Sequence, residues 1–182
     1  MRSTATTLAA IALLAGALTQ SSPTQAGPTD TPLPTFSDGK PALLVYTAAG
    51  VIKNNNLETD VACTNLDSVT RNIALQVFDE TGALRNDLGA GTNGEFLNVG
   101  AGKTVTVGTA GTAVLHEDQT LTLNAGGSGA NLLRNGSGRV VATSKNISCT
   151  AVVLDKLHTI QDPAVSSLPP PPLASVPLVK LP

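Results

Sequence analysis

The stretch Ile73-Ala74-Leu75-Gln76-Val77-Phe78, which runs straight into Asp79-Glu80-Thr81-Gly82, decides the fold class of this chain. Its large apolar residues stand at every second position up to Val77, and this period of two is the spacing of side chains on one face of a β-strand. The acidic residues and Gly82 that follow are typical of a turn that ends a strand. The stretch therefore predicts a half-buried strand followed by a turn.

Further strands are predicted on both sides of this one. Apolar residues alternating with Thr, or short apolar runs, mark the strands, and clusters of Gly and Asn between them mark turns. The predicted strands cover residues 43–47, 60–66, 104–107, 120–123, 139–144 and 147–154. No stretch has the period of an amphipathic helix of useful length. Roughly seven to nine short strands predict a single all-β domain, an immunoglobulin-like β-sandwich over residues 42–161.

The last two predicted strands are close enough in sequence to form a tight hairpin, with Lys145-Asn146 as a two-residue loop. Asn tolerates the left-handed backbone that such loops need. In this register Ala142 lies opposite Cys149, and Cys63 on its own strand can also point inward. The residues predicted to face inward on the hairpin are Val140, Ala142, Ile147, Cys149, Ala151 and Val153.

The first 26 residues have the pattern of a secretory signal peptide. Arg2 is followed by an uncharged run, Leu8–Leu18, and then by Thr24-Gln25-Ala26, which has small residues at the two positions that a signal peptidase reads. The apolar run is too short to span a bilayer as a stable helix. We therefore expect a mature chain that begins near Gly27 and is secreted or periplasmic.

Prolines mark both ends of the expected mature chain. Residues 27–41 contain four prolines and little apolar periodicity, so we expect a flexible leader. Residues 162–182 contain the run Pro169–Pro172 and further prolines, which predict a disordered polyproline II tail that cannot pair in a sheet. The tail can serve as a spacer or as a ligand for an aromatic groove, and both interpretations stay open.

Cys63 and Cys149 are the only cysteines, and each lies in a predicted strand. In an exported chain the simplest expectation is one intramolecular disulfide. Two free thiols or an intermolecular bridge are the alternatives. A metal site at these two thiols is not expected, because partner ligands at a useful spacing are missing.

Composition argues against several classes of partner. Charged residues make up 13% of the chain, the formal net charge is −2, and no stretch gathers several Lys or Arg. We therefore expect no nucleic-acid binding, which needs a basic surface. The aromatic residues are three Phe and one Tyr, too few for a large stacking platform. No segment after the signal approaches the length of a membrane span.

Two short motifs are interpreted as turns. Gly100-Ala101-Gly102-Lys103-Thr104 superficially resembles a nucleotide-binding P-loop, but Leu97 stands where that motif requires Gly, and a strand follows where it requires a helix. His116-Glu117-Asp118 places a possible base beside two carboxylates, in a stretch typical of a solvated turn. His158 lies near Asp155 at the end of the last strand, where a surface role is favoured.

No catalytic residue, cofactor or metal site is therefore predicted. No Ser has the setting of a nucleophile elbow, and no third group orients either His. The scattered carboxylates lack the dense spacing of an EF-hand, although they could line a cation site in a loop. These carboxylates are Asp60, Asp67, Asp79 and Glu80.

Three stretches together resemble small uncharacterised exported bacterial proteins with an immunoglobulin- or fibronectin-III-like sandwich. These stretches are Val61–Leu66 with its Cys-Thr-Asn, Ile73–Gly82 with its Phe-Asp-Glu-Thr-Gly, and Ser148–Asp155 with the late Cys. The chain differs from antibody domains in having no Trp, and from chaperone-assembled pilins in its wider Cys spacing and proline-rich end. The resemblance implies a β-sandwich of bacterial origin and carries no activity.

The sequence as a whole predicts a non-catalytic exported binding or structural module of the cell envelope or extracellular space. Its partner would be an unknown protein or cell-surface component, recognised by loops on a rigid scaffold. One alternative is a subunit of a surface assembly. The other is a secreted hydrolase that uses His116 or His158.

Overall fold

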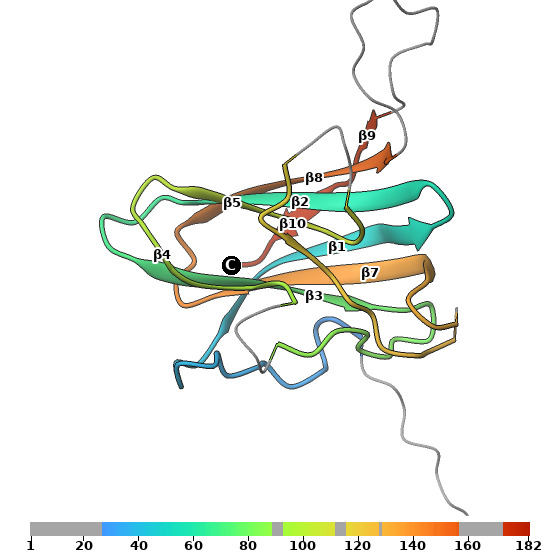
Figure 1. The fold of residues 1–182 in the computed structure, drawn as a ribbon. Helices are drawn as coiled ribbons and strands as arrows, with labels where there is room; N and C mark the ends of the chain where they lie inside the picture. Colours follow the sequence, from blue (N-terminus) through green and yellow to red (C-terminus); the bar gives the residue numbers. More distant parts are fainter. Residues whose placement is uncertain (1–26, 89–92, 112–115, 128, 157–172) are drawn as a thin grey trace, which may run out of the picture.

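The computed structural model describes residues 27–88, 93–111, 116–127, 129–156 and 173–182 (Figure 1). These residues form ten strands and no helix, so none of them belongs to a helix that could cross a membrane. The strands are β1 (Leu43–Asn54), β2 (Leu57–Asn65), β3 (Arg71–Phe78), β4 (Glu95–Val99), β5 (Thr104–Gly108), β6 (Gln119–Thr120), β7 (Leu133–Ala142), β8 (Ile147–Asp155), β9 (Leu173–Ser175) and β10 (Leu178–Lys180). The predicted all-β class is confirmed.

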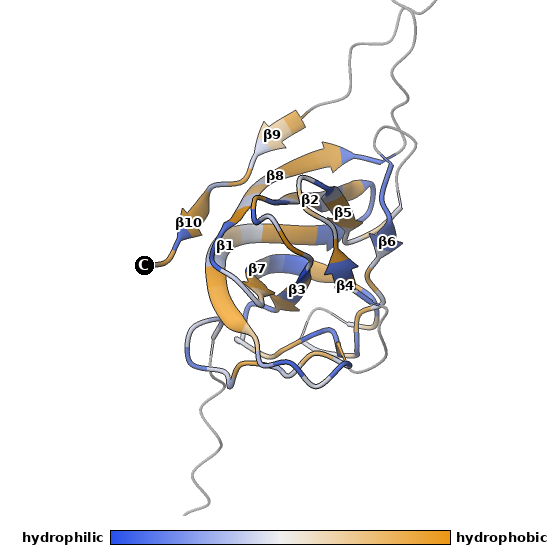
Figure 2. Cartoon of the chain, turned by 90° about the vertical axis from the view of Figure 1, so that its left-hand side faces the viewer, coloured by the Kyte–Doolittle hydropathy of each residue, from blue (hydrophilic) through white to orange (hydrophobic). Residues whose placement is uncertain are grey.

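The strands form one mixed sheet that curls into a half-barrel, as the end-on view of Figure 2 shows. Its main path runs β4-β3-β7-β1-β2-β5-β6. Outside this path, β8 pairs with β2, β9 pairs with β8, and β10 pairs with β1. All pairs are antiparallel except β5–β6, which is parallel. β1 and β2 pair only at Lys53↔Glu58 and Asn54↔Leu57, so the sheet turns sharply where these two strands separate.

Two threonines fill the gap where β1 leaves β2. The hydroxyl of Thr59 accepts a hydrogen bond from the Ile52 N–H (2.9 Å), and the hydroxyl of Thr109 donates one to the Ile52 carbonyl (2.7 Å). The Thr109 hydroxyl also accepts the Thr59 N–H (2.9 Å). Both threonines are fully buried. Side chains therefore satisfy backbone groups that the separated strands can no longer pair.

The main core lies inside the curl of the sheet. Val61 and Cys63 of β2 and Val107 of β5 belong to the same buried cluster as Ile73 and Leu75 of β3. These side chains stand at alternate positions of their strands, which is why period two in the sequence located them. The inward facing predicted for four residues of the last two long strands is confirmed, because all four are buried in this cluster: Val140, Ala142, Ile147 and Ala151.

β3 is buried on both faces, and the expectation of a half-buried strand is wrong. Ala74, Gln76 and Phe78 point away from the main core and are nonetheless at most 4% exposed. The second face is covered by the segment before β1, where Phe36 joins Ala74 and Val141 in a second apolar cluster. β3 is buried on both faces because the segment before β1 covers its second face. That segment has no strand pattern of its own, so the sequence pattern did not indicate the covering.

The expected flexible leader, residues 27–41, is instead packed on the sheet. Arg139 of β7 is 1% exposed, and its guanidinium donates hydrogen bonds to the carbonyls of Pro28 (2.9 Å), Thr31 (2.7 Å) and Pro32 (2.8 Å). Its Nε donates to Oε1 of Gln76 (2.9 Å). The buried guanidinium of Arg139 therefore holds the leader through backbone carbonyl groups. Proline has such a carbonyl group although it has no N–H.

The end of the chain also contradicts the expectation of an unpaired tail. β9 pairs with β8 and β10 pairs with β1, and Pro177 lies between β9 and β10, where a missing N–H interrupts no ladder. We call residues 173–182 the C-terminal strap. Val176 of the strap is buried, and its N–H donates to the Ala151 carbonyl (2.9 Å). Residues 162–172 of the predicted tail lie outside the described residues.

The predicted hairpin between the last two long strands is wrong. β7 pairs with β1 and β3, whereas β8 pairs with β2 and β9. The segment between them crosses from one group of strands to the other. The Thr143 N–H donates to the Asn72 carbonyl, and the Leu66 N–H donates to the Asn146 carbonyl (3.0 Å each). Long-range partners for these backbone groups outweigh the local turn preference of Lys145-Asn146.

Candidate functional site

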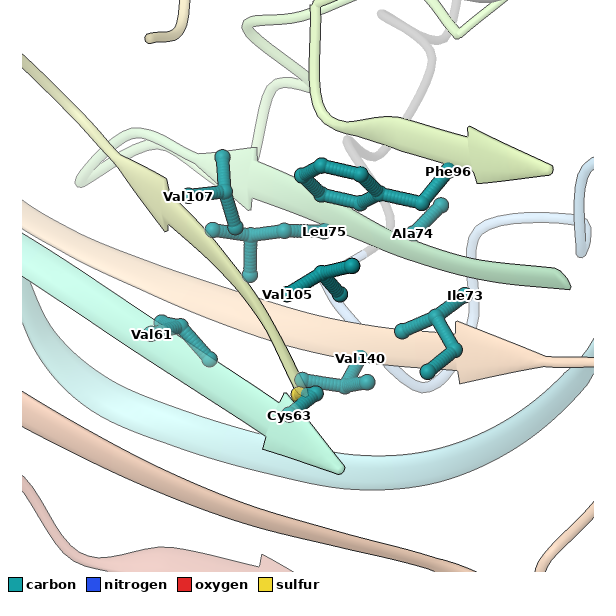
Figure 3. Close-up of a pocket in the computed structure, with 9 residues that line it drawn as sticks. All are labelled: Val61, Cys63, Ile73, Ala74, Leu75, Phe96, Val105, Val107 and Val140. Carbon is teal, nitrogen blue, oxygen red and sulfur yellow. The ribbon is translucent and has the colours of Figure 1, made fainter. Parts of the chain in front are cut away.

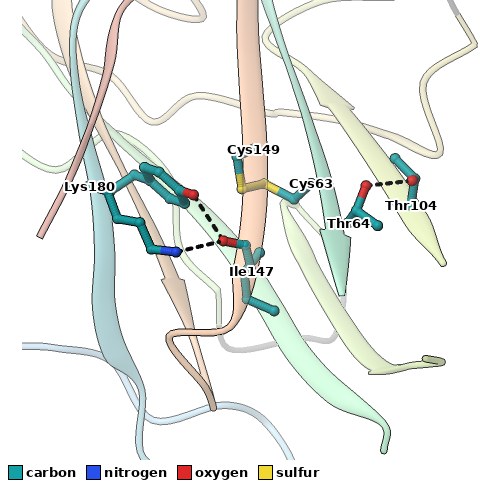
Figure 4. Close-up of a disulfide and its surroundings, with 7 residues drawn as sticks. Cys63, Thr64, Thr104, Ile147, Cys149 and Lys180 are labelled. Atoms are coloured by element: carbon teal, nitrogen blue, oxygen red, sulfur yellow. Dashed lines mark hydrogen bonds between the residues drawn. A yellow bond between two sulfur atoms is a disulfide. The ribbon is translucent and has the colours of Figure 1, made fainter. Parts of the chain in front are cut away.

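The disulfide predicted from the sequence is present and joins neighbouring strands. Cys63 of β2 and Cys149 of β8 are directly opposed in the register, with a Cα–Cα distance of 4.2 Å (Figure 4). Beside the disulfide, the Tyr46 hydroxyl (2.9 Å) and Lys180 Nζ (3.4 Å) both donate to the Ile147 carbonyl. The strap is therefore tied to β8 close to the disulfide.

An apolar cavity lies in the core among β2, β3, β4, β5 and β7 (Figure 3). Its volume is about 10 Å³, which is near the lower limit for a single water molecule. The side chains around it are apolar and include Cys63, Phe96 and Val140. The cavity is too small for an organic ligand, and we interpret it as imperfect packing.

Three carboxyl groups meet on the opposite face of β2. Val61 and Cys63 point into the core, so the alternate positions Glu58 and Asp60 point to the outer face. There Glu117, which lies between β5 and β6 in the sequence, adds the third carboxyl group, and the Ala110 N–H donates to Glu58. The three residues each offer an oxygen atom within 4.8 Å of the others. Glu58 is 0% and Asp60 2% exposed, and Glu117 is partly exposed.

Asp60 has a strongly raised pKa. Burial, reinforced by the negative charges of Glu58 and Glu117 and by a hydrogen bond with Glu117 that only a protonated carboxyl can donate, raises the pKa of Asp60 to about 8. Neither oxygen of Asp60 accepts a hydrogen bond from an N–H or hydroxyl group in the described part of the chain. The cluster therefore requires a shared proton or a bound cation near neutral pH.

The raised pKa of Asp60 predicts that, in the presence of a chelator, stability falls as the pH rises from about 4 to about 8. In this window the folded state retains a proton that the unfolded state has released, so each further rise in pH favours unfolding. The slope that one proton can contribute is at most about 1.4 kcal/mol per pH unit. Besides Glu58 and Glu117, Lys53 of β1 lies within electrostatic reach of the cluster through Glu58.

Urea unfolding of the wild type and of Asp60→Asn, at pH 5 and pH 8 with EDTA, measures this contribution. Asn cannot ionise, so the variant should lose less stability between the two pH values than the wild type does. Equal losses in the two proteins would contradict the assignment of the pH dependence to Asp60.

The candidate site residues that the sequence indicates do not come together in one place. Asp60 lies in the carboxyl cluster, whereas Asp67 accepts hydrogen bonds from Arg71 and Asn146, and Asp79 pairs with buried Arg85. His116 precedes Glu117 and is exposed. His158 lies outside the described residues.

Glu58 was missed by the sequence analysis, and Glu117 was assigned to a solvated turn. The available signal was Glu58-x-Asp60, two acidic residues at alternate positions, one just before and one at the start of the strand predicted over residues 60–66. The interpretation of Gly100–Thr104 as a turn that leads into a strand is confirmed: Gly102 has a φ of 69°, and the Lys103 N–H donates to the Gly100 carbonyl just before β5.

No protein-family model matches this chain, and neither a curated protein nor a solved structure matches it. The candidate site is therefore assessed from its own chemistry. That chemistry is three carboxyl groups with no histidine or thiol among them, in a setting that is closed on the side of β2 and reaches the surface at Glu117.

Proposed function

We propose that the chain is an exported, non-catalytic module of the cell envelope or extracellular space, with a binding or structural role. The Cys63–Cys149 disulfide is the observation that carries the proposal. Disulfides persist in oxidising compartments and are rare among cytosolic proteins, where thiols are kept reduced. The bridge agrees with the secretory signal pattern of residues 1–26.

We infer further that the curled sheet corresponds to an immunoglobulin-like sandwich. β2, β5 and β8 form one paired group and β1, β3 and β7 another, and both groups contribute to one buried cluster. Two residue pairs between β1 and β2 join the two groups. The strap joins them as well, because its strand β9 pairs with β8 and its strand β10 pairs with β1. This arrangement supports the sandwich, since one face of each group lies on a common core.

The placement of the ionisable groups supports a non-catalytic role. Glu58 and Asp60 are buried, and the Ala110 N–H donates to Glu58, so these two carboxyl groups are closed off from a substrate. The alternative hydrolase, which would use His116 or His158, requires one of these histidines beside a carboxylate in an open cleft. His116 is exposed and is not one of the three clustered residues.

Expression from the full-length sequence in a bacterial host tests the export that the proposal requires. We expect the protein recovered outside the cytoplasm to begin near Gly27 and to have no thiol that reacts with an alkylating reagent until it is unfolded and reduced. N-terminal sequencing and mass spectrometry after alkylation measure both properties.

The matched control lacks residues 2–26. It should stay in the cytoplasm, and both of its cysteines should react once the protein is unfolded, because no compartment has oxidised them. Recovery of the full-length protein from the cytoplasm, with its N-terminus intact and both thiols free, would overturn the proposal.

A further inference from the structure

We propose that Glu58, Asp60 and Glu117, together with the backbone carbonyl of Ala110, bind one calcium ion between β2 and the described residues 109–111 and 116–118. This proposal goes beyond the binding or structural role proposed above and replaces the expectation of no metal site.

Oxygen atoms of the three carboxyl groups lie close enough together to bind one ion. A calcium ion takes oxygen ligands at about 2.3–2.6 Å, so ligands on opposite sides of it are roughly 5 Å apart. The carboxylate oxygens of the cluster lie within 4.8 Å of one another, which fits this span. Glu58 is already held in place, because its Oε2 accepts the Ala110 N–H (3.1 Å).

Asp60 lacks the hydrogen-bond donors that a buried carboxylate needs. Its side chain is 2% exposed, and both of its oxygens are buried with no hydrogen-bond donor among the described residues. An ionised carboxylate in this position is costly unless a cation or a proton compensates it. Oε1 of Glu117 is likewise buried without a donor, and it belongs to the same cluster. Two carboxylates thus present unsatisfied oxygens toward a shared position.

Gly108 of β5 leaves space for oxygen atoms beside Asp60, with which it pairs in the register of β5 and β2. A Cβ at Gly108 would collide with Oδ1 of Asp60 and lie 2.5 Å from the carbonyl oxygen of Ala110. The same Cβ would lie 2.9 Å from Cγ of Glu117. Glycine therefore leaves room for a carboxylate and a carbonyl oxygen to approach each other, and a carbonyl oxygen is an ordinary calcium ligand.

The donor set selects calcium among the common cations. All donors are oxygens, which favours hard ions over zinc or copper, whose sites use His or Cys. Calcium accepts irregular arrangements of six to eight ligands, whereas magnesium demands a near-ideal octahedron and keeps several waters. Three carboxylates and a carbonyl, buried on one side and open to solvent near Glu117, match the less regular ion. Two positive charges would offset most of the negative charge gathered there.

Calcium titration of the purified protein, expressed from the full-length sequence and freed of metal with EDTA, tests the site. Isothermal titration calorimetry should show one ion per chain. At a calcium concentration of about 100 times Kd, the Tm should rise by roughly 5–10 °C. Magnesium at the same concentration should produce a smaller rise.

Two variants and one control assign the effect to the cluster. Asp60→Asn and Glu117→Gln should each weaken calcium binding by roughly 100-fold or more, because a direct ligand matters at least as much as the groups that support ligands. Glu117 is partly exposed, so its variant tests the site even if the buried substitution impairs folding. The control Asp30→Asn removes an exposed carboxylate of the leader and should bind like the wild type.

The result that would overturn the site is a wild-type protein that binds no calcium, or calcium binding that both Asp60→Asn and Glu117→Gln retain. A Tm rise with magnesium as large as that with calcium would overturn the choice of ion.

Discussion

Replacing both cysteines, as Cys63→Ala with Cys149→Ala, is expected to lower the free energy of unfolding by about 3–5 kcal/mol. The bridge joins residues 86 positions apart, and closing so long a loop restricts the unfolded chain strongly. Cys63 is also 3% exposed, so its truncation loses packing in the main core. Urea unfolding of the oxidised wild type and of the double variant measures the difference.

The chain offers a matched control one residue away. Thr64 of β2 and Thr104 of β5 are also paired across neighbouring strands, and their hydroxyl oxygens are 2.7 Å apart (Figure 4). Replacing both with Ala should cost less than about 1 kcal/mol, which is typical of an exposed cross-strand pair. If the cysteine variant were no less stable than this control, the stabilisation assigned to the disulfide would be contradicted.

Arg85→Met is expected to lower the free energy of unfolding by about 3–5 kcal/mol. Arg85 is 0% exposed, with its Nη1 at 3.4 Å from Oδ2 of Asp79, and its Nη2 donates to the carbonyls of Asn124 and of Gly129 (2.8 Å). Met fills a similar volume but leaves these carbonyls without a donor and the Asp79 charge without a cation. The expected loss is large because buried polar groups are left unsatisfied.

Asp79 would keep its charge in that variant. Burial acts to raise the pKa of Asp79, but hydrogen bonds from Thr81, Gly127 and Ala83 outweigh it, and the pKa lies below its ordinary value. The matched control is Arg71→Met, since the Arg71–Asp67 ion pair is partly exposed and should contribute less than about 1 kcal/mol. Equal urea midpoints for the two variants would contradict the role assigned to Arg85.

The sequence predicted the class of the fold and the facing of its side chains more reliably than it predicted which strands pair. Period two depends only on local geometry, so Ile73, Leu75 and Val140 were placed correctly on inner faces. Pairing depends on distant residues, and the two-residue turn rule wrongly joined β7 to β8. The disulfide was predicted correctly, because the expected inward facing of the two cysteines and the secretory signal pattern of residues 1–26 were sufficient for it.

The leader and the strap could not be predicted from local patterns. Proline-rich stretches are typical of unpaired chain, and neither segment has an alternating pattern. What orders the leader is Arg139, a buried cation more than 100 positions away from Pro28. What orders the strap is the pairing with β1 and β8, together with burial of Val176.

The carboxyl cluster was not predicted, although Asp60 was among the scattered carboxylates that could line a cation site in a loop. Polar residues at alternate positions of a strand ordinarily face solvent, and nothing in residues 57–65 indicates that Glu117 lies beside them. Glu117 lies between β5 and β6 along the chain, and the sequence alone assigned it to a solvated turn. A site assembled from one strand and one remote loop leaves no compact motif.

The strap also protects an edge of the sheet. β10 pairs with Tyr46–Ala48 of β1, on the side from which β2 has separated. A strand edge with unpaired N–H and C=O groups can pair with another chain, and short edge strands limit such pairing. Among the described strands, the three-residue β10 thus takes the place of the twelve-residue β1 at this edge and leaves other chains a shorter template for aggregation.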